Sequence, residues 1–203
     1  MNKEEINRIL LENKVILAPS DTVWGLCGVV SQEVFDELNK LKVRNKKPYL
    51  ILAQSFKIIQ TLIELPADPA QCALVESFWP GPLTVIFKAN RQAPAYCVSP
   101  EGTIAFRVVK HKLLEELLES APLLFSTSAN ITGCPVPSSF QDIDPSLVSG
   151  VAACVVDDQS MAQSVVPSTI IDLSQGQLRL IREGAIPFDE IKEKLESLRT
   201  SLK

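Results

Sequence analysis

Four short segments place polar or charged residues where a plain hydrophobic core would exclude them. The first runs from Pro19 to Gly25 and directly follows the apolar stretch 15–18, which predicts a buried strand. Loops at the carboxyl ends of strands are where α/β proteins commonly bind ligands. We therefore expect Asp21 and Thr22 either to contact a ligand or to satisfy backbone groups in a tight turn.

The second segment, Lys42 to Pro48, is strongly basic and lies between a predicted helix and a predicted strand. Such a connection is expected to be extended, which would point Lys42 and Arg44 in the same direction. Two neighbouring cations favour an anion between them, and a phosphate suits the paired N–H groups of arginine. A solvated basic loop is the alternative interpretation.

The third segment is the predicted strand 103–108. Its alternation places Ile104 and Phe106 on one face and Thr103 and Arg107 on the other. An arginine on such a strand needs a partner or a wet cavity, because an isolated buried charge is very costly. The partner would be either a structural carboxylate or the carboxylate or phosphate of a ligand.

The fourth segment, 126–133, carries hydroxyl or amide groups at most of its positions and follows the apolar strand 123–125. Ser126, Ser128 and Asn130 share a face if the chain stays extended. Such a row can donate hydrogen bonds to phosphate or sugar oxygens without adding charge. A capped turn is the alternative.

Common catalytic motifs are missing from the sequence, which contains no GxxxxGK[ST], GxGxxG or GxSxG pattern. The single histidine, His111, comes just before a predicted amphipathic helix, where a surface or helix-end role is favoured. Five scattered cysteines without CxxC spacing argue against a structural zinc site or a disulfide framework: Cys27, Cys72, Cys97, Cys134 and Cys154. Any chemistry is therefore expected to depend on binding and positioning rather than on a covalent nucleophile.

Length and composition predict one globular domain. The chain has 203 residues, of which 46% are hydrophobic and 22% are charged. Its charged start lacks the apolar core of a signal peptide, and no apolar run reaches the roughly 18 residues of a membrane span, so we expect a cytoplasmic protein. The net charge of −4 argues against a broad nucleic-acid surface but allows a local basic pocket.

Periodicity and capping residues predict a mixed α/β fold that positions these segments. Strands are expected near 15–18, 49–53, 83–88, 103–109, 123–125, 153–156, 169–173 and 178–181. Helices are expected at 2–13, 31–41, 69–79 and 111–120, and from about 188 to 202. Because some strands follow each other without a helix, the sheet should be mixed rather than parallel.

Taken in order, these segments resemble the YrdC-like family of threonylcarbamoyl-AMP synthases between about Val15 and Gly184. The family pattern P-T-[DE]-T-V-Y-G-L resembles residues 19–26, with Ser20 for Thr and Trp24 for Tyr. The other matching patterns are K-x-R at 42–44, W-P-G-P-[LV]-T at 79–84, T-[IV]-[AG]-x-R at 103–107, S-x-N at 128–130, S-T-[IV]-[IV]-D at 168–172 and R-x-G at 182–184.

The resemblance implies a single domain, 1–203, with a core of about 15–184 and a twisted mixed sheet around a concave basic cavity. It implies that Thr22 and Arg107 hold L-threonine, and that Lys42 and Arg44 are the catalytic cations. It further assigns nucleotide contacts to Lys42, Arg44, Lys47, Thr103, Ser128, Asn130, Ser168 and Arg182. No protein-bound metal is implied, and Mg²⁺ is expected to enter with ATP.

The implied activity is that of a nucleotidyltransferase. L-threonine and bicarbonate or CO₂ would form a carbamate, which would attack ATP to give threonylcarbamoyl-adenylate and pyrophosphate. The chain ends soon after Gly184, as in the short bacterial form, which passes its product to a separate transferase complex that modifies tRNA. Weak tRNA binding stays open, and no membrane partner is implied.

Three positions depart from the family pattern, and two other functions stay open. Lys47 follows Arg44 at a shorter spacing than usual, Leu52 lies where some relatives carry a histidine, and Val136 lies near a position that is serine in some relatives. The alternatives are a double-stranded RNA or tRNA-binding module, and a paralogue of the same fold with another acceptor.

Overall fold

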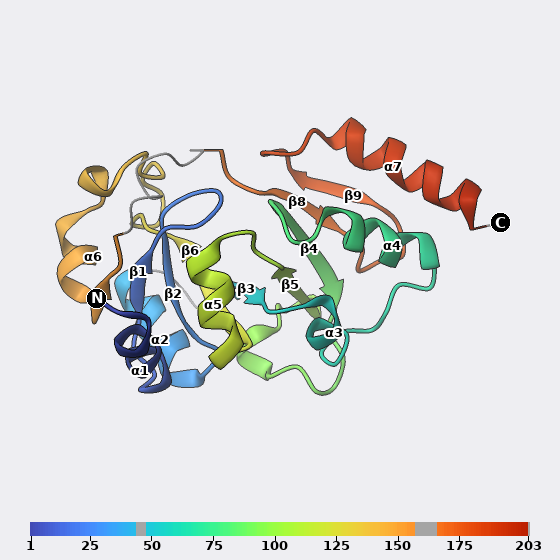
Figure 1. Ribbon diagram of the computed structural model, residues 1–203. Coiled ribbons are helices and arrows are strands. Elements are labelled where there is room, and N and C mark those ends of the chain that lie inside the picture. Colours follow the sequence, from blue (N-terminus) through green and yellow to red (C-terminus); the bar gives the residue numbers. More distant parts are fainter. Residues whose placement is uncertain (44–47, 157–165, 203) are drawn as a thin grey trace.

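A nine-stranded mixed sheet runs through the part of the chain that the structure, a computed structural model, describes: residues 1–43, 48–156 and 166–202 (Figure 1). The pairs β1–β7, β3–β5 and β4–β8 are parallel and the others antiparallel, which confirms the predicted mixed α/β fold. The strand order is β7 (Ala153–Cys154), β1 (Ile16–Ala18), β2 (Gly25–Val29), β6 (Leu123–Ser128), β3 (Leu50–Ala53), β5 (Thr103–Arg107), β4 (Leu83–Lys88), β8 (Thr169–Asp172) and β9 (Arg179–Arg182).

The sheet separates two hydrophobic cores. Consecutive residues of a strand face opposite sides, so Ile51 belongs to the first core and Leu52 to the second. The first core lies under α2 (Gln32–Leu41), α3 (Phe56–Ile59), α4 (Pro69–Phe78), α6 (Pro145–Gly150) and α7 (Phe188–Ser201). The second core lies under α1 (Lys3–Leu11) and α5 (Lys112–Ser120). The helices α4 and α7 lie side by side near the C-terminus (Figure 1). The described residues also form two short 3₁₀ turns, η1 (Ala95–Cys97) and η2 (Phe140–Asp142).

The second core covers only half of its face of the sheet. Its strand residues come from β7, β1, β2, β6 and β3, and not from β5, β4, β8 or β9 within the described ranges. On that second half, the residues facing this side include Thr84, Arg107 and Ile170. The same sheet is therefore packed by helices at one end and left open, with polar side chains, at the other.

The helix starts follow the predicted capping chemistry. The Asn2 side chain accepts a hydrogen bond from the Glu5 amide, and the Glu5 side chain reaches back to Asn2, so the pair forms a capping box. The Ser31 hydroxyl accepts from the Val34 amide at the start of α2. Pro69 begins α4, as expected for a residue without an amide proton. No helix in the described ranges is long and apolar enough to span a bilayer.

The structure corrects the predicted path after α2 and lengthens one strand. Lys42 is helical, with φ −81° and ψ −7°, and Val43 has a φ of 48°, so the extended connection predicted from Lys42 is wrong at these two residues. The C-terminal turn of α2 continues through Lys42 before the chain changes direction. Arg44 and Lys47 lie outside the described residues, so their placement beside Lys42 stays a prediction. The polar segment after Phe125 begins as strand, because β6 continues to Ser128.

Gly184 offers a direct test of how closely two segments pack. A Cβ at this position would lie 2.2 Å from the Pro167 carbonyl oxygen and 2.6 Å from the Ser168 carbonyl carbon. We expect Gly184→Ala to lower the free energy of unfolding by about 3 kcal/mol, because a backbone must move to admit the methyl group. Gly176→Ala, where φ is 74° and no atom lies within 4 Å, should cost about 1 kcal/mol from backbone strain alone. Urea denaturation of both variants measures the difference, and equal losses would contradict the close approach.

Candidate functional site

The open half of the sheet, together with adjoining residues of β2, β6 and β3, forms the floor of a cavity of about 440 Å³. Both lining arginines and a row of hydroxyl groups face it, whereas none of the described residues that line it is acidic. Its polar and charged lining residues are Ser20, Thr22, Thr84, Arg107, Ser126, Thr127, Ser128, Ser168 and Arg182. A concave site with this lining is suited to anionic ligands.

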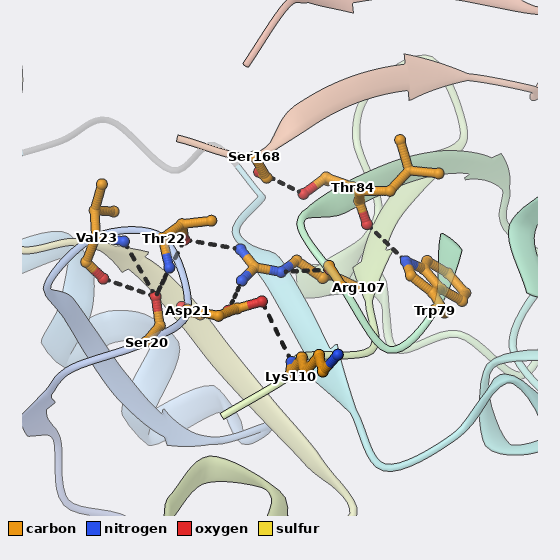
Figure 2. A network of polar contacts seen from close by, with 12 residues as sticks. Ser20, Asp21, Thr22, Val23, Trp79, Thr84, Arg107, Lys110 and Ser168 are labelled. Atoms are coloured by element: carbon orange, nitrogen blue, oxygen red, sulfur yellow. Dashed lines mark hydrogen bonds and ion pairs between the residues drawn. The ribbon is translucent and has the colours of Figure 1, made fainter. Parts of the chain in front are cut away.

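Arg107 lies at the end of β5, with its guanidinium held on three sides (Figure 2). Its Nε donates to the Gly81 carbonyl at 3.2 Å and its Nη1 donates to the Thr22 hydroxyl at 3.0 Å. Its Nη2 forms an ion pair with Asp21. Arg107 is 3% exposed, and this desolvation, with the positive charge of Arg182, lowers the pKa of Arg107 to about 10. It is therefore still protonated at neutral pH, with Asp21 as its counter-ion.

The loop that carries Asp21 and Thr22 is organised by Ser20 (Figure 2). The Ser20 hydroxyl accepts from the amides of Thr22 and Val23, both at 3.2 Å, and donates to the Val23 carbonyl at 2.8 Å. The two interpretations of this loop from sequence are thus compatible. The turn satisfies its own backbone groups, and it also brings Thr22 to the cavity beside Arg107.

Lys42 lies behind the end of β6 rather than in the cavity lining. Its ammonium donates to the Ser128 carbonyl at 2.7 Å and to the Asn130 side-chain oxygen at 3.0 Å, and the side chain is buried. The Ser128 hydroxyl donates to the same Asn130 oxygen at 2.6 Å. Lys42, Ser128 and Asn130 therefore form one connected network, of which Ser128 faces the cavity. The phosphate contact expected of Lys42 stays a prediction.

Arg182 lies across the cavity from Arg107, on the edge strand β9. Its Nη2 donates to the Ser168 carbonyl at 2.8 Å, and partial burial lowers its pKa. Within the described ranges no carboxylate pairs with it, in contrast to Arg107. Among the described lining residues, Arg182 is therefore the cation whose charge no carboxylate compensates.

The structure brings five of the predicted site residues to one cavity: Thr22, Arg107, Ser128, Ser168 and Arg182. Asn130 lines a neighbouring groove instead, and Thr103 is outside the lining, where its hydroxyl pairs with that of Ser99 at 2.9 Å. Arg44 and Lys47 are outside the described residues.

Sequence reasoning missed Thr84 as a candidate, although its place in the W-P-G-P-L-T pattern was a signal. Two further lining residues, Leu52 and Val136, are positions where the chain departs from the family pattern.

Comparison with known proteins identifies relatives over most of the chain. The family model Sua5_yciO_yrdC, described as "Telomere recombination", matches residues 8–184. A threonylcarbamoyl-AMP synthase of Pyrococcus abyssi (strain GE5 / Orsay) is 29% identical over 191 residues, or 93% of this chain and 55% of that protein. One of Coxiella burnetii (strain RSA 331 / Henzerling II) is 36% identical over 131 residues, or 63% of this chain and 70% of that protein.

Solved structures show the same architecture. Sua5 of P. abyssi in complex with L-threonine superposes with a TM-score of 0.84 at 26% identity, covering 95% of this chain and 56% of that chain. YciO of E. coli has a TM-score of 0.81 at 20% identity, covering 94% of each chain, and shows the fold alone. The chain thus spans about half the length of the P. abyssi relative.

The Asp21–Arg107 ion pair predicts a non-additive effect on stability. We expect Arg107→Leu to cost about 3–5 kcal/mol of unfolding free energy, because it leaves the Asp21 carboxylate largely buried without a cation. Arg107→Leu combined with Asp21→Asn should recover part of that loss. Lys88→Leu, which breaks the exposed pair with Glu64, should cost less than about 1 kcal/mol. Denaturant titration of the four proteins tests this, and a double variant no more stable than Arg107→Leu would contradict it.

Proposed function

Because the chain belongs to the Sua5/YciO/YrdC family, we propose that it is a threonylcarbamoyl-AMP synthase that makes threonylcarbamoyl-adenylate from L-threonine, bicarbonate or CO₂, and ATP. The observation that carries the proposal is the cavity itself. Two arginines and a row of hydroxyls face a space without a lining carboxylate among the described residues. Such a lining suits a reaction that must bring several anions together.

The proposed reaction has two bond-forming steps. First, the threonine ammonium group gives up a proton to solvent water. Its nitrogen then attacks the carbon of CO₂, releasing a second proton to water, or the carbon of bicarbonate with loss of water, to form a carbamate. A carbamate oxygen then attacks the α-phosphorus of ATP, and the bond from that phosphorus to the leaving pyrophosphate breaks. The protein's main task is to neutralise the negative charges and align the reacting groups, so no side-chain nucleophile is required.

Arg107 and Thr22 are proposed to bind threonine. A guanidinium has five N–H groups, of which three are used by Gly81, Thr22 and Asp21. One N–H therefore stays available on each of Nη1 and Nη2. Arg107 can thus bind the threonine carboxylate while it keeps its ion pair with Asp21.

The nucleotide is proposed to lie along the other cavity walls. Ser128, Ser168 and Arg182 would contact its phosphate or sugar oxygens. Lys42 and Arg44 are proposed as the catalytic cations, with Lys42 acting from behind Ser128 through the network that it shares with Asn130. Contacts from Lys47 and Thr103 complete the proposed set.

Mg²⁺ is proposed to arrive as the complex with ATP, held mainly by phosphate oxygens and water. The donor set fits this view, because the described cavity residues supply hydroxyls and arginines rather than a cluster of carboxylates. The product adenylate would pass to a separate transferase complex that acts on tRNA. As a nucleotidyltransferase the protein would need no stable tRNA complex of its own.

The decisive assay is pyrophosphate release from ATP and bicarbonate with and without L-threonine. We expect release to require threonine. We expect Arg182→Ala to lower kcat/KM for ATP by about ten- to a hundredfold, the usual effect of losing a hydrogen bond to a charged group. Arg179→Ala is the matched control, because Arg179 lies on the same strand but outside the cavity lining and should retain near wild-type kinetics.

The contrary outcomes are distinct. A folded protein that binds ATP but releases no pyrophosphate with any amino acid would support a paralogue with another acceptor. Salt-sensitive binding of double-stranded RNA without ATP turnover would instead support an RNA-binding module.

A further inference from the structure

The segment Trp79 to Thr84 holds Arg107 through the Gly81 carbonyl and ends in the cavity, but none of its side chains has yet been assigned a ligand contact. Trp79 packs against the rings of Phe56 and Phe87, and its indole N–H donates to the Leu83 carbonyl at 2.6 Å. The start of β4 is therefore held firmly. Thr84, the next residue, lines the cavity while its side chain is almost fully buried, at 2% exposure.

Thr84 lies between the two cavity arginines on the floor of the sheet. On one side it pairs with Ile170, which in turn pairs with Arg182. On the other side, the neighbouring pair Val85–Phe106 places Thr84 next to Arg107. Because Thr84, Arg107 and Arg182 all line the cavity, the Thr84 side chain lies between the two arginines on the cavity floor.

The hydroxyls of Thr84 and Ser168 share one hydrogen bond of 2.9 Å (Figure 2). Each hydroxyl carries a single proton, and their shared bond uses one of the two. The Ser168 oxygen also lies 3.4 Å from Arg182 Nη2, which donates toward it, and this favours an arrangement in which Ser168 donates to Thr84. Within the described residues no acceptor takes the second proton, although both side chains are at most 5% exposed.

A buried hydroxyl proton without an acceptor costs free energy unless a molecule in the cavity accepts it. An acceptor between two arginines is most stable when it carries negative charge. We propose that Thr84 is a substrate-contacting residue whose hydroxyl donates to an anionic oxygen bound between Arg107 and Arg182. This inference rests on the proposed function, in which that oxygen belongs to the threonine carboxylate or carbamate or to a phosphate of ATP.

The test compares Thr84→Val, which removes the hydroxyl at nearly constant volume, with Thr84→Ser, which retains it. We expect Thr84→Val to lower kcat/KM for pyrophosphate release by about ten- to a hundredfold, and Thr84→Ser to stay within about threefold of wild type. A higher KM for threonine would assign the oxygen to the amino acid, and a higher KM for ATP would assign it to the nucleotide. Thr61→Val is the control, because its exposed hydroxyl donates to the Ile58 carbonyl and Thr61 is not part of the cavity lining.

Calorimetric titrations with L-threonine, ATP and inorganic phosphate separate this inference from the proposed function. Weaker binding of one of them to Thr84→Val, but not to Thr84→Ser, supports the contact even if wild type releases no pyrophosphate, a result that would overturn the proposed function alone. If Thr84→Val does not fold, Thr84→Ala replaces it, because a smaller side chain leaves room around Ser168. A folded variant without the hydroxyl that keeps wild-type kinetics and wild-type affinity for all three ligands would overturn the inference, with water as the acceptor.

Discussion

The burial of the Arg107 guanidinium is the constraint around which the site is organised. A cation that is 3% exposed is tolerated only if a carboxylate neutralises its charge and most of its N–H groups have acceptors. Its partners come from a loop after β1, through Asp21 and Thr22, and from the turn before β4, through Gly81. These segments are far apart in sequence, so the cavity wall forms only when the whole sheet is assembled.

Helices cover only part of one face of the sheet, which explains why polar side chains can lie on the rest of that face. Under α1 and α5, the second core takes the side chains of β7, β1, β2, β6 and β3, and Leu52 and Leu124 are fully buried there. On the β5, β4, β8 and β9 half, the same face carries Thr84, Arg107 and Ile170 toward the cavity. The opposite face is packed by the first core over both halves, with Phe106 and Ile171 in its interior. The first core therefore supports the sheet on the face opposite the cavity, while the cavity face stays free for ligands. This is the condition for a preorganised site.

Local sequence patterns predicted the helices and strands well, but they could not predict which residues distant in the sequence contact one another. Alternation placed Arg107 on the face opposite Phe106, because period two is a property of any strand. It could not identify Asp21, 86 residues away, as the carboxylate that neutralises it. The strand β2 was missed because Gly25–Val29 contains two glycines and no alternation, and it is stabilised by its neighbours β1 and β6. Thr84 was missed because a β-branched residue is ordinary in a strand, whereas its hydrogen bond to Ser168, which directly precedes β8, is a tertiary contact.

The two cavity arginines differ in a way that bears on how anions enter. Arg107 is paired with Asp21, so the field that it projects into the cavity is largely cancelled at a distance and acts mainly through its two remaining N–H groups. Within the described ranges Arg182 has no carboxylate partner and is more exposed, so its field extends toward solvent. A highly charged ligand such as a nucleoside triphosphate would be attracted first toward Arg182. A small carboxylate would instead be stabilised by hydrogen bonds from Arg107 at short range. Under the proposed function, Arg182 would attract the nucleotide over a longer range and Arg107 would bind the threonine carboxylate at short range, so the two ligands would occupy different parts of the same sheet face.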